Sequence, residues 1–380
     1  MIKRTLQELC LNITDGKHGD CENEENSGYY FISCKDIFDG QINYKNARQI
    51  TKADFEETHK RTMLEVDDIL LTNSGTIGRM AFVTDREATT KTTFQKSVAI
   101  IKPDKQKVLP RYLYYQLQNC VPQFINSSNG SAQKNLLLST MRTFQIEIEE
   151  NREKQEKIAN TLSAYDDLIE NNQKQIKLLE EAAQRLYKEW FVDLRFPEHE
   201  NTKIVDGVPE GWSRTNINEI LTFHRGYDLT KNEMKAGRYP VVGSTTVIGY
   251  HNEFKIKGPG IVTGRSGSLG KYQFIWDNFW PHNTSLYISD YKDHNIFFVY
   301  NLLQTVDFAS LNNGGAIPTL NRNVLSNIEV IEPTDELQEM FAKIAEPQYQ
   351  KIKNLEKQND RLKTVRDLLL PKFMSGEVEV

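Results

Sequence analysis

Two long stretches of the chain carry apolar residues at alternating four- and three-residue steps, which is the seam pattern of a coiled-coil helix. The first stretch starts near Ile158, the second starts near Phe341, and charged and amide side chains surround both seams. The pattern predicts two long helices packed as an antiparallel coiled coil, with a kink or a late start at Pro347 in the second. The seam residues are Ile158, Leu162, Ile169, Asn172, Ile176, Leu179, Leu186, Ile352, Leu355, Asn359, Leu362 and Leu369.

One polar residue interrupts each seam. If the helices pack antiparallel about their midpoints, Asn172 lies opposite Asn359, and a buried Asn pair fixes register at some cost in stability. The alternative is two unrelated polar interruptions.

Short apolar runs alternate with Gly and Asn turns ahead of each long helix, a pattern typical of an α+β module. The runs predict strands at 29–33, 68–72, 81–84 and 98–101, and again at 239–242, 260–263, 272–275 and 285–288. Short helices are expected at 110–119 and 295–304.

The two modules are copies of each other. Residues 74–79 (SGTIGR) recur as residues 266–271 (SGSLGK), and the apolar run before them recurs too. Three further matches keep the same order: 28–33 with 237–242, 97–100 with 285–288, and 129–132 with 313–316. Four matches in one order indicate a duplication, which should be sought before any other assignment because it decides the fold.

The expected fold is therefore α+β, with two pseudo-repeated α/β modules separated by two long helices packed as an antiparallel coiled coil. The boundaries are 1–149 for the first module, 150–196 for the first helix, 197–333 for the second module, and 334–380 for the second helix and tail.

Composition narrows the class of protein. The first residues carry no apolar stretch, which argues against a signal peptide, and no run reaches the roughly 20 apolar residues of a membrane helix. The four cysteines show no metal-ligand spacing and fit reduced thiols. We expect a cytoplasmic protein with no membrane association and no bound metal.

Motifs for bond chemistry are missing from the sequence. An amino-methyltransferase needs an N/D-P-P-[YF] motif, and the chain contains no Pro-Pro pair. The Gly-rich segment 264–271 has the wrong spacing for a phosphate-binding loop. We expect no catalysis by this chain and no cofactor bound to it.

The motifs resemble those of the specificity subunit of a type I restriction–modification system. Segment 208–212 (VPEGW) looks like the entry to that family's second target-recognition domain. Segments 237–244 (GRYPVVGS), 248–252 (IGYHN) and 279–284 (FWPHNT) are similar to its recognition-domain pattern. Residues 155–162 and 369–378 resemble its two helical regions.

The resemblance implies a non-catalytic chain that binds a bipartite, asymmetric sequence in double-stranded DNA, one half-site per recognition domain. It also implies two methyltransferase subunits, which bind S-adenosylmethionine and methylate adenine N6. Restriction and translocation subunits that use ATP and Mg would join them. The paired helices would act as a ruler between half-sites and as a docking surface for the modification subunits.

Charge sets a condition on DNA binding. Residues 1–149 carry 19 basic against 19 acidic side chains, and residues 197–333 carry 12 against 14. Neither module is basic, so phosphate affinity has to come from local patches or from partners, and the isolated chain should bind weakly and in a salt-sensitive way.

The two Ser-Gly-[TS]-[IL]-Gly loops are the main candidates for DNA contact, because Gly permits close backbone approach while hydroxyls and basic groups reach phosphate or guanine. A tight structural turn is the alternative for these loops. The candidate DNA-contacting residues are Asn73, Ser74, Thr76, Arg79, Lys91, Lys96, Gln133, Lys134, Asn135, Arg225, Tyr250, His251, Arg265, Ser266, Ser268, Lys271, His282, Asn283, Thr284, Asn312 and Asn313.

Two other functions stay open from the sequence. A coiled-coil adaptor with duplicated domains that bind other ligands would show the same repeat. A silent or phage-borne specificity chain would show the same motifs.

Overall fold

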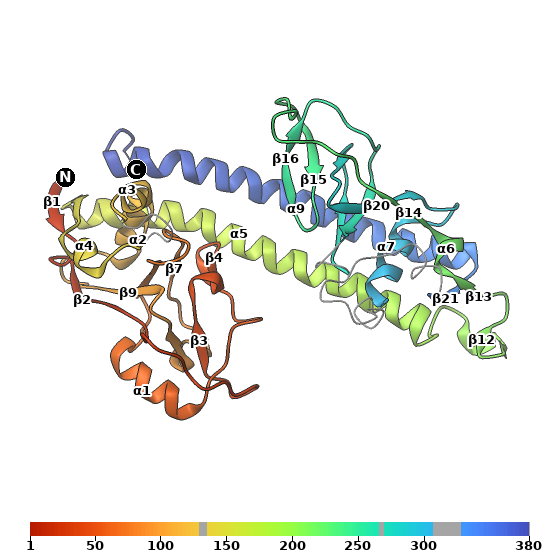
Figure 1. Ribbon diagram of the computed structural model, residues 1–380, viewed down its shortest axis with the longest axis horizontal. Coiled ribbons are helices and arrows are strands. Elements are labelled where there is room, and N and C mark those ends of the chain that lie inside the picture. Colours follow the sequence, from red (N-terminus) through yellow and green to blue (C-terminus); the bar gives the residue numbers. More distant parts are fainter. Residues whose placement is uncertain (129–134, 266–269, 307–327, 380) are drawn as a thin grey trace. The chain divides into compact units, whose positions relative to one another are not determined.

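The computed structural model describes residues 1–128, 135–265, 270–306 and 328–379, and it divides into two compact units. Unit 1 comprises residues 1–169 and 360–380, and unit 2 comprises residues 170–359. The helices α5 (Arg152–Tyr187) and α9 (Asp335–Ser375) each contribute one part to either unit (Figure 1).

Unit 1 is a mixed module whose centre is a four-stranded antiparallel sheet. The strands of unit 1 are β1 (Ile2–Thr5), β2 (Cys10–Asp15), β3 (Tyr30–Ile32), β4 (Ile37–Phe38), β5 (Gln41–Ile42), β6 (Ile69–Thr72), β7 (Met80–Phe82), β8 (Thr92–Phe94), β9 (Val98–Pro103) and β10 (Gln145–Ile148). Its short helices are α1 (Lys52–Thr62), α2 (Pro110–Asn119), α3 (Val121–Asn126) and α4 (Leu138–Thr143). The central sheet has the order β2-β9-β6-β7, and β3 pairs with β8 in parallel beside it.

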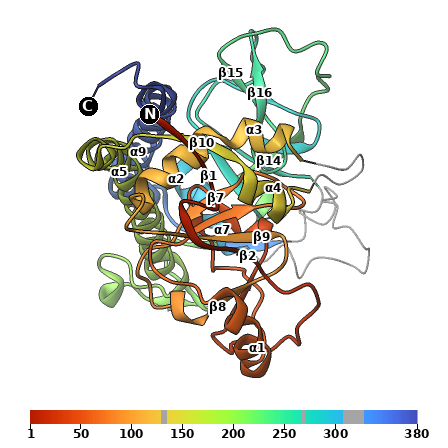
Figure 2. The same ribbon diagram turned by 90° about the vertical axis from the view of Figure 1, so that its left-hand side faces the viewer.

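Alternating side chains of the central sheet enter two different cores, as the two-residue period of a strand requires. Ile69 and Leu71 pack with α2 and the ends of the long helices, whereas Leu70 packs with the β3–β8 pair. Helix α1 lies on the side of the sheet away from α2 in both views (Figure 1 and Figure 2). Because both faces are covered, the strands read as continuous apolar runs rather than as alternating ones.

Unit 2 has the same architecture. Its strands are β11 (Ile204–Val205), β12 (Val208–Pro209), β13 (Ser213–Asn216), β14 (Thr222–Arg225), β15 (Tyr239–Val242), β16 (Val247–His251), β17 (Gly260–Gly264), β18 (Tyr272–Ile275), β19 (Trp280–Pro281), β20 (Ser285–Asp290) and β21 (Glu329–Glu332). Its short helices are α6 (Ile217–Ile220) and α7 (Ile296–Thr305). The central sheet has the order β14-β20-β17-β18, and β15 pairs with β19 in parallel.

The duplication read from the sequence is confirmed, because each strand of one central sheet has its counterpart in the other in the same spatial order. The predicted strands and short helices lie within two residues of the observed ones. The match of 129–132 with 313–316 lies outside the described residues. The copies differ after the strand that pairs in parallel, which is β3 in unit 1 and β15 in unit 2. In unit 1 this strand is followed by β4, β5 and α1, whereas in unit 2 it forms a hairpin with β16.

The long helices pack antiparallel within each unit. In unit 1, Ile158 and Leu162 share a core with Phe373, and Asp166 accepts hydrogen bonds from Arg366 (2.6 Å) and from the Tyr115 hydroxyl (2.5 Å). The seam residues are all buried or half-buried.

The seam of unit 2 contains the predicted asparagine pair. The Nδ2 of Asn172 donates to Oδ1 of Asn359 at 2.9 Å, and both residues are buried. Nδ2 also lies 3.3 Å from Oε1 of Gln358. The expectation that Asn172 and Asn359 lie opposite each other is confirmed.

The expected late start of the second helix is wrong. Helix α9 begins at Asp335 and continues as a single helix through Pro347. Pro347 is exposed, so water can hydrate the carbonyl of Lys343, which lacks a hydrogen-bond donor because proline has no N–H.

Candidate nucleic-acid interface

In unit 1, three hydrogen bonds close the neck of the loop between β6 and β7, and a fourth ties the loop to Ser97, directly before β9. The N–H of Thr72 donates to the carbonyl of Arg79 (2.8 Å), and the N–H of Arg79 donates to Oγ1 of Thr72 (2.9 Å). The N–H of Gly78 donates to the carbonyl of Thr72 (3.0 Å), and Asn73 donates to the carbonyl of Ser97 (3.0 Å). The loop is therefore held by its base while Thr76 and Arg79 are exposed.

Two glycines allow this loop its path. Gly75 and Gly78 have φ of +79° and +95°, where a side chain strains the backbone. A Cβ at Gly78 would also lie 2.5 Å from Cγ1 of Val121. Gly78 thus lets the loop approach α3 closely.

Several predicted residues converge around this loop. Ser74 bridges to Asn135, and the N–H of Leu136 donates to the carbonyl of Asn73 (2.8 Å). Arg79 reaches the carbonyl of Cys34 through Nη1 (3.4 Å). Lys96 adjoins Ser97 and is exposed, so it lies at the same end of the sheet.

One predicted residue of unit 1 lies elsewhere. Lys91 precedes β8, whereas Lys96 follows it, so the two lysines lie at opposite ends of this strand. Both side chains are exposed. The structure therefore does not bring Lys91 to the loop between β6 and β7.

Unit 2 gathers its predicted residues at the corresponding end of its sheet. The N–H of Arg265 donates to the carbonyl of Thr284 (3.1 Å), and Oγ of Ser244 donates to the same carbonyl (2.8 Å). His282 Nδ1 lies 2.9 Å from Oγ1 of Thr284. Exposed Lys271 follows the same loop, immediately before β18.

An acidic residue lies among these groups. Asp228 accepts a hydrogen bond from Nδ2 of Asn283 and lies 4.0 Å from Nη2 of Arg225. The Asp228 side chain is 80% exposed. The negative charge of this carboxylate repels phosphate. It also pairs with the Asn283 amide and the Arg225 guanidinium, which are two of the candidate DNA-contacting groups.

The other predicted residues of unit 2 belong to the hairpin. Tyr250 is exposed on β16. His251 is buried, with its ring edge-on to Trp280 at 5.3 Å, and its Nδ1 accepts a hydrogen bond from the N–H of Lys235 (3.0 Å). His251 therefore packs inside the unit rather than at its surface.

Six predicted residues lie outside the described part of the chain. They are Gln133, Lys134, Ser266, Ser268, Asn312 and Asn313.

Gly16 in unit 1 and Gly226 in unit 2 occupy a further glycine position beside the candidate surfaces, which the sequence does not reveal. A Cβ at Gly16 would lie 1.9 Å from the carbonyl oxygen of Phe94, and one at Gly226 would lie 2.0 Å from that of His282. The next residue in each copy donates its N–H at 2.8 Å, Lys17 to Phe94 and Tyr227 to Pro281. The matching segments share only this glycine, which is too weak a signal to detect in the sequence.

Aromatic groups lie beneath the unit 2 surface. The hydroxyls of Tyr227 and Tyr287 are 2.9 Å apart, and burial raises the pKa of Tyr287, so this side chain stays neutral near pH 7. Nζ of Lys255 lies 4.7 Å from the ring centroid of Trp280. These contacts fix the aromatic layer on which the exposed polar residues rest.

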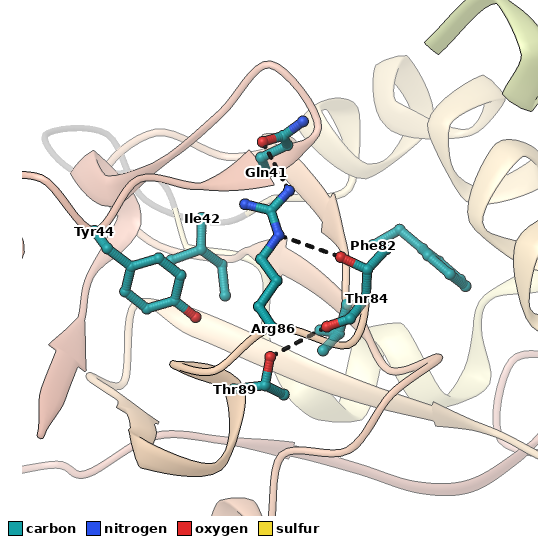
Figure 3. A pocket seen from close by; sticks show the side chains of 8 residues that line it. Gln41, Ile42, Tyr44, Phe82, Thr84, Arg86 and Thr89 are labelled. Carbon is teal, nitrogen blue, oxygen red and sulfur yellow. Dashed lines mark hydrogen bonds between the residues drawn. The ribbon is translucent and has the colours of Figure 1, made fainter. Parts of the chain in front are cut away.

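A small cavity in unit 1 is not a ligand site. It has a volume of about 20 Å³, room for about one water molecule. Arg86 fills much of its wall, donating to Oε1 of Gln41 (3.0 Å) and Oγ1 of Thr84 (3.3 Å) (Figure 3). An organic ligand does not fit there.

Two further observations concern only the described residues. No group of three or more His, Cys, Asp and Glu side chains among them could hold a metal ion. None of the helices they form is long and apolar enough to cross a membrane.

Comparisons with known proteins give the family. The family model of the type I restriction modification DNA specificity domain matches residues 3–181 and 209–364. The MjaIX specificity subunit of a type I restriction enzyme from Methanocaldococcus jannaschii is 27% identical, covering 92% of this chain and 87% of that relative. The HindI specificity subunit of Haemophilus influenzae is 23% identical, over 73% and 80% of the two chains.

A solved structure shares the fold. The S subunit of a type I restriction–modification system from M. genitalium superimposes with a TM-score of 0.59 and 20% identity, covering 98% of this chain and 95% of that one. Because two segments that together make up most of the chain match the family model, this protein belongs to the type I restriction–modification DNA specificity family and is a DNA sequence-specificity subunit, not a catalytic one.

Proposed function

We propose that this chain recognises a bipartite, asymmetric sequence in double-stranded DNA, with one half-site read by each unit. The observation that carries the proposal is the repeated site. In both units, basic and amide side chains gather at the same end of an equivalent sheet. They surround the loop that joins β6 to β7 in unit 1 and the loop that joins β17 to β18 in unit 2. The side chains differ between the copies, as two different half-sites require.

The base-reading set differs in chemistry between the units. Unit 1 presents Arg79 and Lys96, whereas its predicted residue Asn73 is buried, and unit 2 presents Arg265, His282 and Asn283. Arg reads guanine through O6 and N7, while Asn reads adenine through N6 and N7. Lysine contributes mainly phosphate affinity, which positions a protein on the duplex without specifying a sequence.

The proposed partners follow from the family. Two methyltransferase subunits would supply S-adenosylmethionine and methylate adenine N6, and restriction subunits would supply ATP- and Mg-dependent translocation and cleavage. The seam of α5 and α9 would hold the two units at a set spacing and offer its outer surface to the methyltransferase subunits. We place the assembled complex in the cytoplasm.

Unit-specific substitutions test the proposal. In the complex with methyltransferase subunits, we expect Arg79→Ala to relax the sequence preference in one half-site by about 1–3 kcal/mol and Arg265→Ala to do so in the other. Lys96→Ala should weaken binding to all sequences and lower the salt slope by about one. Competition binding with duplexes altered in either half-site measures all three effects.

Two results would contradict the proposal. One is an equal loss at both half-sites for either arginine variant. The other is a complex that binds random duplexes as tightly as any selected sequence, which would instead support a chain that no longer directs methylation.

A further inference from the structure

Each unit has a buried threonine at the base of its candidate recognition loop. Thr72 ends β6 and pairs with Val98 of β9, and Thr263 of β17 pairs with Leu286 of β20. Both threonines are fully buried. They are not the same position of the repeat, because the match of residues 74–79 with 266–271 aligns Thr263 with Leu71, but each lies at the base of the loop of its own unit.

Each threonine hydroxyl binds the chain where it returns from the loop. Oγ1 of Thr72 accepts a hydrogen bond from the N–H of Arg79 (2.9 Å). Oγ1 of Thr263 donates one to the carbonyl of Lys271 (3.0 Å). The direction of donation differs, but in both copies the bond closes the loop directly at a basic candidate residue.

We propose that Thr72 and Thr263 are positioning residues for sequence recognition, each setting the loop of its own unit. This inference rests on the proposed function of the two units. Neither side chain can touch DNA, since both have no exposed surface. Any effect on recognition must therefore pass through the loop neck and the attached Arg79 or Lys271.

Valine tests the hydroxyl alone, because it has the shape of threonine without the oxygen. The variant removes one of the hydrogen bonds at the loop neck and leaves the Arg79 N–H without its partner, and we expect Thr72→Val to reduce discrimination at one half-site by about five- to tenfold. Thr263→Val should reduce it at the opposite half-site. Thr72→Ser and Thr263→Ser keep the hydroxyl and should restore discrimination.

The measurement is competition binding by the complex of the full chain with its methyltransferase subunits. Three duplexes are compared: the intact target, and the target with either half-site scrambled. Hydrogen exchange of the Arg79 amide gives a second readout, which should accelerate in Thr72→Val and return to normal in Thr72→Ser.

A matched control separates positioning from general stability. Thr92 is another fully buried threonine of unit 1, and its hydroxyl donates to the carbonyl of Ala88 (2.7 Å) and lies 3.0 Å from the Tyr44 hydroxyl. Thr92 is the first residue of β8, at the end of this strand away from the loop between β6 and β7. We expect Thr92→Val to lower the melting temperature without changing discrimination at either half-site.

The outcomes are distinct. The inference is supported if each valine variant loses discrimination at a different half-site and the corresponding serine variant retains it. Unchanged discrimination in both, or losses equal to that of Thr92→Val, overturn it while leaving the proposed function intact. If one valine variant fails to fold, the variant of the other unit decides. If the unaltered complex shows no half-site discrimination, the proposed function fails first.

Discussion

The buried pair of Asn172 and Asn359 allows a quantitative test of the helix packing. Replacement of Asn172 by leucine leaves the Asn359 amide buried without its 2.9 Å partner. An unsatisfied buried polar group costs about 1–3 kcal/mol, whereas replacing both partners by apolar groups can be neutral or stabilising. The double variant Asn172→Leu/Asn359→Leu should therefore be more stable than either single variant.

The magnitude follows from the coupling between the two positions. We expect an interaction energy of about 2 kcal/mol between the substitutions, because each single variant strands the other amide. Asn172 keeps a longer 3.3 Å contact with Gln358 in Asn359→Leu, so that variant should be the milder of the two. Asn171→Leu, at the exposed neighbouring position, should change stability by less than about 0.5 kcal/mol.

Tryptophan fluorescence is a suitable assay. All four tryptophans lie in unit 2, at positions 190, 212, 276 and 280. Urea unfolding followed at these residues reports the unit that contains the asparagine pair. Strict additivity of the two substitutions would refute the reasoning, since it would mean that the amides do not depend on each other.

Three other expectations follow from named contacts. Burial raises the pKa of Asp68 to about 6, despite the 2.8 Å hydrogen bond from Lys102. The protonated Asp68 therefore stabilises the folded state fully below about pH 4, and this stabilisation is lost as the pH rises through 6. Asp68→Asn should remove up to about 3 kcal/mol of that pH dependence in urea unfolding of unit 1, and an unchanged pH slope would contradict this. Gly78→Ala should destabilise unit 1 by about 1–3 kcal/mol, because Gly78 has a positive φ and a Cβ there would lie 2.5 Å from Val121. It should lower the melting temperature of unit 1 more than Gly28→Ala, whose Cβ would meet no neighbouring atom, and equal losses would contradict this. Asp228→Asn should tighten binding to DNA of any sequence and steepen its salt dependence, because the variant removes a carboxylate beside Arg225; unchanged affinity at low salt would count against the location of the unit 2 surface.

Much of the fold could be predicted because it rests on short-range patterns. The strands β6, β9, β17 and β20 are buried on both faces, so they appear as apolar runs bounded by turns. The helical seam appears in the same way. The asparagine pair could be predicted because the two helices are pseudo-symmetric about their midpoints.

Other features depend on contacts that no local pattern records. The Tyr115–Asp166–Arg366 network joins positions 51 and 200 residues apart. Gly16 and Gly226 are each required by a carbonyl oxygen from a segment distant in the sequence, and the residues next to the two glycines differ. The polar neighbours of His251 in the sequence predict a surface position, whereas its ring packs edge-on against Trp280.

The candidate site was predicted in part. The loop residues and the set at 282–284 converge because equivalent loops of a duplicated sheet lie at the same end. The sequence does not distinguish Thr72 and Thr263, because a threonine at a strand end is common and the partner of its hydroxyl depends on how the strands pair.

The most direct test of the central claim is long-read methylation sequencing of DNA from a host without other methylation. The chain would be expressed with its methyltransferase subunits, and a culture lacking only this chain would serve as the control. We expect one bipartite N6-methyladenine motif that is present with the chain and absent without it. Methylation that is identical in the two cultures would contradict the claim that this chain directs sequence recognition.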